Sequence, residues 1–113
     1  MKKIEAIIRS SKLHDLQEEF QNFELNAMMV LADVKSFGKE EGHTEYYRGH
    51  KFEVNFIPKT KVEIICKDED VEKVKSSIFQ IAHTGKVGDG KIVVTNVENL
   101  SKIRTGEENE EAI

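Results

Sequence analysis

The chain has 113 residues, of which 17 are basic and 21 acidic, so its formal net charge is −4. A single domain of this length buries roughly two thirds of its surface without a disulfide or metal to staple it, and Cys66 is the only cysteine. Four glutamates stand near the C-terminus, Glu107, Glu108, Glu110 and Glu111, and without them the chain is neutral. Nucleic-acid-binding domains normally carry a basic excess, so this balance argues against that class.

The first half of the chain predicts a strand, a helix and a second strand. Residues 2–8 alternate between charged and apolar side chains, which indicates a strand. An apolar stripe at spacings of three and four follows, and it predicts one buried helix face made of Leu13, Leu16, Phe20 and Phe23. Residues 28–34 are largely apolar and predict the next strand.

The second half repeats this order. Residues 51–56 and 61–66 predict strands, and a helix is expected to start near Asp68, where consecutive acidic residues favour a helix N-terminus. The apolar face of that helix consists of Val71, Val74, Ile78 and Ile81. Residues 91–97 are β-branched and predict the last strand. Two β-α-β units in series predict an α+β fold, the ferredoxin-like split βαβ sandwich, with both helices on one face of an antiparallel sheet.

The strands, the cysteine and the N-terminal residues support three further expectations. Strands as apolar as 28–34, 62–66 and 91–97 are hard to leave facing water, so we expect a homo-oligomer that covers the second sheet face. Cys66 lies in an apolar run and is expected to be a buried small hydrophobe rather than a nucleophile or ligand. The opening residues, MKKIEAIIRS, predict neither a secretion signal nor a membrane span, so a cytoplasmic location is expected.

The segment between the two halves is a candidate functional loop. Residues 35–51 contain Gly38, Gly42 and Gly49 and lack apolar periodicity, and no predicted helix or strand contains a glycine. A loop this long in a small domain is typical of a functional segment, so we interpret it as a flexible interaction loop. The whole chain is expected to form one domain, with a solvated acidic tail at 107–113.

A second glycine cluster has the composition of a phosphate-binding loop. Residues 84–91, TGKVGDGK, contain three glycines, which let backbone N–H groups approach an anion closely. The cations that would serve a phosphate are Lys86, Lys91, Lys102 and Arg104. The spacing is nearly that of a P-loop, but Ile92 stands where that motif requires a hydroxyl, and a strand rather than a helix follows. The cluster therefore predicts phosphate binding on a different scaffold.

Together these motifs resemble the PII signal-transduction proteins, trimeric sensors of nitrogen and energy status that bind ATP or ADP and, with the nucleotide, 2-oxoglutarate. The resemblance covers nearly the whole chain, in the blocks MKKIEAIIR, FGKEEGHTEYYRG, FIPK, TGKVGDGKI and KIRTGE. The last two blocks, at this separation and combined with the long loop, make a specific signature. The resemblance implies a homotrimer with nucleotide in the clefts between subunits, and a regulator rather than an enzyme.

The resemblance also implies a set of nucleotide-binding residues. One subunit would supply Thr84, Gly85, Gly88, Asp89, Gly90 and Lys91, with Glu63 and Ile65 near the ribose and adenine. Lys102 and Arg104 would reach in from the neighbouring subunit, and Lys39 would close on the terminal phosphate. Lys39 and Lys102 stand where the family has arginine, so a guanidinium that can bind an anion through two hydrogen bonds is replaced by an ammonium group, which acts as a point charge. We expect phosphate affinity to survive both exchanges.

Two departures from the family concern the effector and covalent control. Glu40 stands where the family has a glutamine that helps hold magnesium between ATP and 2-oxoglutarate, while Lys59 keeps the position that pairs with the distal carboxylate of the effector. A carboxylate can bind Mg²⁺, but here it adds negative charge beside a triphosphate and a dianion. We therefore expect a weakened or absent 2-oxoglutarate response. Phe52 replaces the tyrosine that relatives have nucleotidylylated, and His50 replaces a phosphorylated serine, which excludes covalent switching by those routes.

The expected mechanism is a nucleotide-gated interaction. ATP and ADP would compete for the cleft and set the conformation of loop 35–51 through Lys39 and Glu40, because the γ-phosphate favours one of two loop states. The loop would then bind or release a partner, which the resemblance implies to be an ammonium transporter or an enzyme or regulator of nitrogen metabolism. The residues expected to contact that partner are Tyr47, Arg48 and Gly49.

Three alternatives stay open at this point. The first is a dual ATP and 2-oxoglutarate sensor of the usual kind. The second is a slow nucleotide hydrolase, although no residue near the phosphate loop forms a base or nucleophile pair, and Asp89 alone is more typical of a turn. The third is a nucleotide-independent or RNA-binding module, but the chain lacks the aromatic pattern with which such sheets stack bases.

Overall fold

The structure, a computed structural model, describes residues 1–23, 25–37, 43–47, 50–54 and 56–113. Its main sheet consists of β1 (Lys2–Ile8), β2 (Met28–Ser36), β5 (Ile57–Cys66) and β6 (Gly90–Asn96). The helices are α1 (Leu13–Gln21) and α2 (Val71–Ala82), and a second, two-stranded sheet consists of β3 (His43–Tyr47) and β4 (His50–Val54). Short 3-10 helices span Ser10–Lys12, Asp68–Asp70 and Asn109–Ala112. None of these described helices is long and apolar enough to span a membrane.

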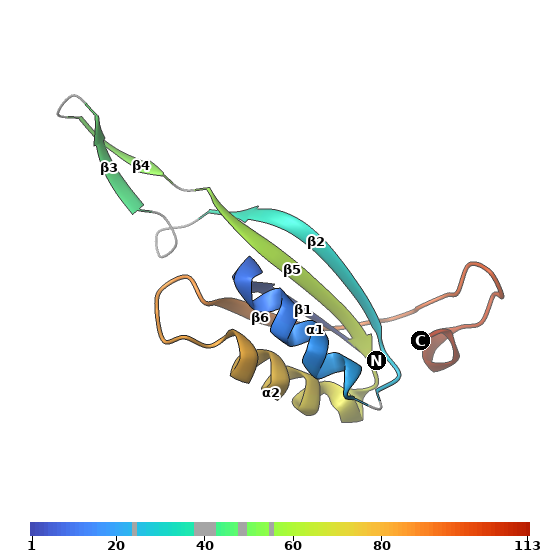
Figure 1. The fold of residues 1–113 in the computed structure, drawn as a ribbon. Coiled ribbons are helices and arrows are strands. Elements are labelled where there is room, and N and C mark those ends of the chain that lie inside the picture. Colours follow the sequence, from blue (N-terminus) through green and yellow to red (C-terminus); the bar gives the residue numbers. More distant parts are fainter. Residues whose placement is uncertain (24, 38–42, 48–49, 55) are drawn as a thin grey trace.

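The strands of the main sheet lie in the order β2-β5-β1-β6, and every neighbouring pair is antiparallel. Both helices cover the same face of this sheet (Figure 1). Helix α1 connects β1 to β2 across the intervening β5, and α2 connects β5 to β6 across the intervening β1. Two β-α-β units interleaved in this way form the split arrangement, so the predicted ferredoxin-like α+β fold is confirmed.

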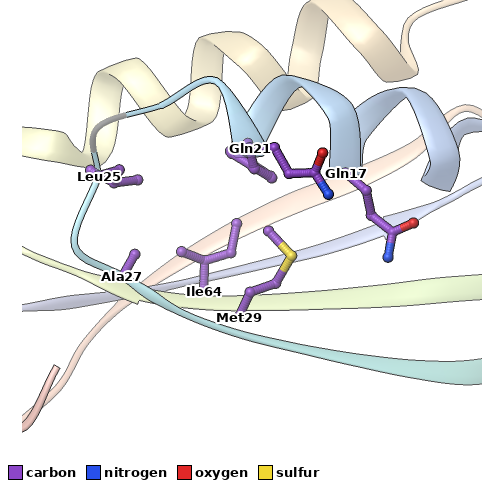
Figure 2. Close-up of a pocket in the computed structure, with 7 residues that line it drawn as sticks. Gln17, Gln21, Leu25, Ala27, Met29 and Ile64 are labelled. Atoms are coloured by element: carbon purple, nitrogen blue, oxygen red, sulfur yellow. The ribbon is translucent and has the colours of Figure 1, made fainter.

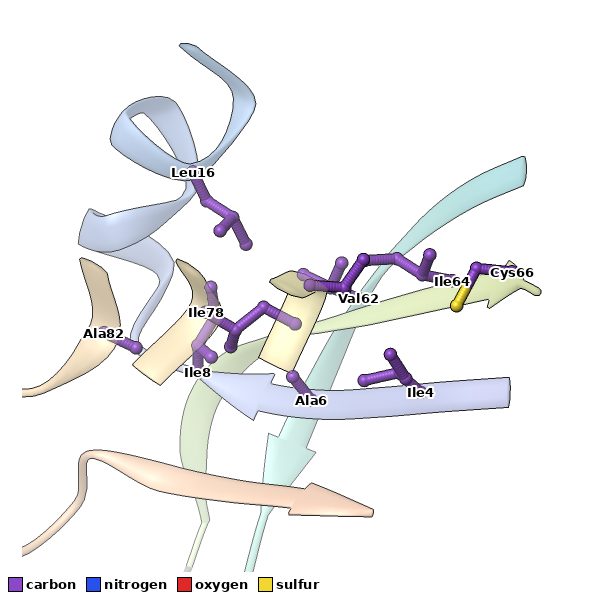
Figure 3. Packing of buried hydrophobic residues seen from close by; sticks show 10 residues of the cluster. Ile4, Ala6, Ile8, Leu16, Val62, Ile64, Cys66, Ile78 and Ala82 are labelled. Atoms are coloured by element: carbon purple, nitrogen blue, oxygen red, sulfur yellow. The ribbon is translucent and has the colours of Figure 1, made fainter. Parts of the chain in front are cut away.

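The hydrophobic core lies between the sheet and the helices. On β1 every second side chain, Ile4, Ala6 and Ile8, points toward the helices and is at most 1% exposed. Figure 3 shows these side chains among the other core residues, which include Leu16, Val62, Ile64 and Ile78. Truncation of a side chain as buried as Leu16 to alanine costs about 2–5 kcal/mol. The core therefore decides which face each strand presents to the helices and which it leaves open.

Cys66 and three of the four residues of the predicted helix stripe lie as expected, whereas the placement of Phe23 on the helix was wrong. Leu16 is buried, and Leu13 and Phe20 pack against the core. Phe23 lies beyond the end of α1, with its ring edge-on to Phe20 at 5.4 Å. Cys66 is fully buried, and burial raises the pKa of its thiol. A buried, protonated thiol is chemically inert, which agrees with its predicted role as a small hydrophobe.

The segment predicted as a loop at 35–51 is partly regular. β2 continues to Ser36, and β3 pairs with β4 from His43↔Val54 to Tyr47↔His50. The strand predicted at 51–56 exists as β4, but it pairs with β3 and lies outside the main sheet. In Figure 1 this hairpin projects away from the sandwich. Sequence alternation indicated β4, but residues 43–47 carry no apolar periodicity, so β3 was not predicted.

β5 begins at Ile57 rather than at the predicted position 61. It pairs with β2 from Ser36↔Ile57 onward, and with β1 only from Thr60. Pro58 has no N–H to donate, and it lies where β2 is the only neighbour of β5. Pro58 and Lys59 interrupt the apolar pattern, which is why the sequence did not predict this extension.

Two other boundaries and the acidic tail differ from the sequence prediction. Gly90 opens β6, so the expectation that no strand contains a glycine was wrong. The α-helix starts at Val71, because the acidic residues before it form a 3-10 turn in which Asp68 pairs with the N-terminal ammonium at 2.9 Å. In the acidic tail, the Glu108 carboxylate accepts hydrogen bonds from Asn99 and the hydroxyl of Ser101. The tail is thus folded against the preceding segment rather than frayed.

The second face of the main sheet carries no helix. The register aligns Val30, Glu63, Glu5 and Val93 in one row across the four strands. Val30 and Val93 at the two edges are 47% and 51% exposed, while the middle of the row is acidic. In this row the apolar side chains therefore stand on the two edge strands, β2 and β6.

Candidate functional site

Residues 84–91, called the glycine loop below, connect α2 to β6 at the end of the sheet where β1 finishes (Figure 1). Gly85, Gly88 and Gly90 have φ angles of +86°, +101° and +104°. Side chains are strained in this region of backbone conformation. Each of these three positions therefore favours glycine, and the loop owes its shape to them.

Asp89 braces the glycine loop from within. Its Oδ2 accepts the backbone N–H groups of Thr84 and Gly85 at 2.7 and 2.9 Å, and its Oδ1 accepts the Thr84 hydroxyl. These hydrogen bonds, above all those from Thr84, hold the pKa of the Asp89 carboxyl well below its ordinary value. Thr84 and Gly85 were both expected in the nucleotide site, and here their N–H groups bind this carboxylate.

Arg9, immediately after β1, holds the loop from outside. Its Nε donates to Asp89 Oδ1 at 3.3 Å, and its Nη2 donates to the carbonyl of Val87 at 2.8 Å. A Cβ atom on Gly88 would lie 3.2 Å from Nη2, so the guanidinium packs against this glycine. Sequence reasoning did not select Arg9 as a site residue. The only signal was its position at the end of the predicted strand 2–8, because nothing local connects it to residue 89.

Lys59 is a second cation on the glycine loop. The residue is 2% exposed, and its Nζ donates to the carbonyl of Gly88. It also lines a cavity of about 350 Å³, together with Ser10, Asp33, Val34, Lys35 and Pro58. A buried ammonium group is costly unless it is hydrogen-bonded. The residue predicted to meet the effector carboxylate is thus already bound to the loop.

Lys91, Glu63 and Ile65 belong to the open face of the sheet. Lys91 pairs with Ile7 on β1, and Ile7 in turn pairs with Lys61 on β5. Glu63 and Ile65 follow Lys61 along β5, so each lies further from the glycine loop than the one before. Ile65 is 7% exposed, whereas Lys91 is exposed. The structure places the three predicted residues on one face, spread from Lys91 beside the loop, through Glu63 in the middle of the sheet, to Ile65 near its far end.

Lys102 and Arg104 lie in a turn near the C-terminus. The N–H of Lys102 donates to the carbonyl of Glu107, and the N–H of Gly106 donates to the carbonyl of Lys102, both at 2.8 Å. The Lys102 ammonium lies 3.6 Å from the carboxylate of Glu107, whose pKa is lowered by a hydrogen bond from Thr105 and then by Lys102. Figure 1 shows this turn at the opposite end of the sheet from the glycine loop. The two predicted phosphate-binding elements do not meet within one chain.

Part of the predicted site lies outside the described residues, namely Lys39, Glu40, Arg48 and Gly49. Tyr47 is the last residue of β3, and Phe52 lies within β4. Where the structure describes the chain, no three His, Cys, Asp or Glu side chains gather as they would around a metal ion. The predicted magnesium ligand, Glu40, is not among the residues to which that statement applies.

Two further cavities differ in chemistry from the cavity at Lys59. One, of about 300 Å³, lies between α1 and the sheet, and Figure 2 shows Gln17 and Gln21 on the helix above Met29 and Ile64. Its lining carries no charged side chain and offers no cation to a phosphate. The other, of about 250 Å³, lies on the helix side of β6 and is lined mainly by apolar atoms, with Lys75 among its lining residues.

The interleaved βαβ sandwich, the braced glycine loop and the projecting hairpin define a class of small α+β signalling domain. The sequence model of the family described as "Nitrogen regulatory protein P-II" matches residues 1–107, and the chain belongs to this family. Its members are signal-transduction regulators rather than enzymes, as the resemblance implied.

Individual relatives agree over their full length. The chain is 50% identical to the nitrogen regulatory protein P-II of Pasteurella multocida and 48% identical to that of Haemophilus influenzae. It is 47% identical to the nitrogen regulatory protein P-II 1 of Escherichia coli K12. Each comparison covers 100% of this chain and 100% of the relative.

Proposed function

We propose that the protein binds ATP and ADP between subunits and regulates a partner protein of nitrogen metabolism through the segment that carries its hairpin. The observation that carries this proposal is the separation of two basic elements: the glycine loop lies at one end of the sheet, and the turn with Lys102 and Arg104 lies at the other (Figure 1). A second copy of the chain would bring its turn to the loop of the first. The phosphates would then be held from both sides.

This arrangement of loop and turn has a consequence for assembly. A contact between the loop of one copy and the turn of the next uses two different surfaces, and such heterologous contacts form rings when the rotation closes. The homotrimer implied by family resemblance is a ring of this kind. It would also cover Val30 and Val93, the exposed apolar residues on the edge strands of the open face.

The open face offers a route for the rest of the nucleotide. In the proposed site Lys91 and the backbone around Gly88 hold the phosphates, because positive charge and accessible N–H groups both favour an anion. Glu63 and Ile65 continue from Lys91 along the face, toward the ribose and adenine. Lys39 closes on the terminal phosphate and distinguishes ATP from ADP.

The 2-oxoglutarate response is weakened or absent in this proposal. In the structure the Lys59 ammonium donates to the Gly88 carbonyl, so the effector carboxylate would have to share this ammonium with the loop. Glu40 adds a second obstacle, since its carboxylate repels both the triphosphate and the dianion unless Mg²⁺ lies between them. The alternative of a dual sensor requires that Mg²⁺ binding overcome both effects.

The partner-binding segment comprises β3, β4 and the residues between them in the sequence. Tyr47, Arg48 and Gly49 would contact an ammonium transporter or an enzyme or regulator of nitrogen metabolism. The protein would act in the cytoplasm and meet a membrane only through such a transporter. Because Phe52 has no hydroxyl, control is by ligand rather than by nucleotidylylation at this position. The γ-phosphate supplies the differential contact that shifts the segment between two states.

The hydrogen bonds that the Asp89 carboxylate accepts argue against the alternative of a nucleotide hydrolase. Asp89 is the only carboxylate of the glycine loop, and it accepts hydrogen bonds from Thr84, Gly85 and Arg9. A carboxylate held by that many donors is a weak base. It therefore shapes the loop rather than activating water.

The test is calorimetric titration of the protein with ATP and with ADP, each repeated with Mg²⁺ and 2-oxoglutarate. We expect saturable binding of both nucleotides that 2-oxoglutarate does not strengthen. Clear enhancement by 2-oxoglutarate would instead indicate the dual sensor. If neither nucleotide binds, the proposed phosphate site is wrong. Sustained ATP turnover that disappears in Lys91→Ala would revive the hydrolase.

A further inference from the structure

We infer that Arg9 is a positioning residue for nucleotide phosphates, which holds the glycine loop in its anion-binding shape without touching the ligand. The inference rests on the proposed nucleotide site. The loop contains three glycines with positive φ, and other contacts must keep it in one conformation. Glycine loses more conformational freedom than any other residue when it is ordered. A loop of this composition therefore needs external contacts if it is to be preorganised.

The Arg9 guanidinium makes three contacts with the loop. Nε donates to Asp89 Oδ1, and Nη2 donates to the carbonyl of Val87 at 2.8 Å. The group also lies against Gly88, where a Cβ would stand 3.2 Å from Nη2. A lysine ammonium is a point charge and cannot make both hydrogen bonds while packing flat on the glycine. The geometry thus selects arginine at position 9.

The hydrogen bond to Val87 orients the next amide. In a trans peptide the C=O and the N–H point in opposite directions, and the described residues contain no cis bond. Because the Val87 carbonyl is directed at Arg9, the N–H of Gly88 is directed to the other side of the loop. An anion would lie on that side, so the hydrogen bond from Arg9 to the Val87 carbonyl directs the Gly88 N–H toward the anion.

Arg9 also offsets the charge of Asp89. The brace that closes the loop is a carboxylate, and a bare carboxylate beside a triphosphate would weaken binding by repulsion. The guanidinium lies against this carboxylate, with Nε 3.3 Å from Oδ1. The loop can therefore keep its internal brace and still accept an anion.

The first experiment needs no nucleotide. Amide hydrogen exchange at Thr84 and Gly85, which donate to Asp89, is compared in the wild type, Arg9→Gln, Arg9→Lys and the control Lys75→Gln. Lys75 is an exposed helix residue that lines a neighbouring cavity. We expect protection at both amides to fall about tenfold in the two Arg9 variants and to stay unchanged in the control. Unchanged protection in Arg9→Gln would overturn the inference whatever the nucleotide does.

The second experiment measures affinity for ATP and for adenosine. Arg9→Gln is expected to weaken ATP binding about tenfold, the order of one charge-assisted hydrogen bond, and to leave adenosine binding unchanged. Arg9→Lys should fail to restore ATP binding, because lysine retains the charge but lacks the planar guanidinium that makes both hydrogen bonds. If Arg9→Lys binds ATP like the wild type, Arg9 acts only as a charge and the inference is wrong.

A double-mutant cycle with Asp89→Asn separates positioning from direct contact. If Arg9 acts through the Asp89 brace, the double variant Arg9→Gln/Asp89→Asn should bind ATP no more weakly than the weaker single variant. Additive losses would mean that Arg9 acts independently of the Asp89 brace, and together with unchanged exchange protection in Arg9→Gln they would assign Arg9 to direct nucleotide contact, which contradicts the inference. Absence of ATP binding in the wild type would refute the proposed function, and the exchange experiment would still decide the role of Arg9.

Discussion

Gly90 lies so close to the backbone of Ile7 that a Cβ atom built on it would stand 1.7 Å from the Ile7 carbonyl oxygen. The contact occurs where β6 begins to pair with β1, at the register Ile8↔Gly90. Its φ angle of +104° adds a second reason for glycine at this position. The same residue thus belongs to the glycine loop and starts the strand that anchors it.

Gly90→Ala should therefore destabilise the protein by at least about 3 kcal/mol, because the added methyl group meets backbone that cannot move aside and the φ angle is strained. Gly106→Ala is the matched control. Gly106 also has positive φ, +75°, but nothing lies within 4 Å of an added Cβ, so only strain of about 1 kcal/mol is expected. Urea unfolding at one fixed protein concentration measures both. Equal losses in the two variants would contradict the steric argument.

Lys91→Gln should separate phosphate recognition from base recognition. Loss of one charge-assisted donor should weaken ATP binding roughly 10–100-fold, while adenosine binding should not change. The control is Lys73→Gln on the exposed face of α2, where the lysine lies over the ring of Phe23. Calorimetry with both ligands makes the comparison. A parallel loss of adenosine binding would indicate that Lys91 supports the structure rather than the phosphates.

A site shared between subunits should show complementation. Lys91→Ala removes the loop cation of one chain, and Lys102→Ala/Arg104→Ala removes the turn cations of another. Each variant alone should bind ATP poorly, but co-expressed chains should recover sites where an intact loop meets an intact turn. A chain with all three changes, co-expressed with Lys91→Ala, is the control and should recover none. No recovery in the first mixture would contradict a site between subunits.

Asp89 predicts a pH dependence of stability with a definite sign. Its pKa is depressed in the folded protein by hydrogen bonds from Thr84, Gly85 and Arg9, so its stabilisation is present above the ordinary carboxyl pKa of about 3.9 and is lost as pH falls below it. Asp89→Asn should therefore reduce the free energy of unfolding at neutral pH, and the difference from wild type should shrink on acidification. Urea unfolding between pH 7 and pH 3, with Glu98→Gln as an exposed carboxylate control, measures this. A pH-independent difference would contradict the assignment.

Glu40→Gln tests the electrostatic account of the effector response. Removing this carboxylate should strengthen 2-oxoglutarate binding in the presence of Mg²⁺ and ATP, roughly tenfold for one unfavourable charge contact near the surface. Glu41→Gln, which removes the neighbouring charge, is the control. Calorimetric titration with 2-oxoglutarate measures both variants. If affinity in Glu40→Gln equals that of wild type, the carboxylate at position 40 does not set the response.

The fold was accessible to sequence reasoning because its signals are local. Alternation in 2–8 and the helical spacing from Leu13 to Phe20 each reflect one face packed against a core. The failures have a physical reason as well. Residues 43–47 carry no apolar periodicity, so β3 was missed, and Pro58 interrupts the pattern at the start of β5.

The candidate site also combines features that the sequence predicts with features that only the tertiary structure creates. The amino-acid sequence by itself determined the βαβ order and the glycine loop, since periodicity and positive-φ glycines act within a few residues of chain. Only the tertiary structure brought Arg9 onto Asp89, buried Lys59 on Gly88 and set the turn near the C-terminus at the opposite end of the sheet from the loop. These relations depend on strand order and register, which arise when distant segments bury a common core.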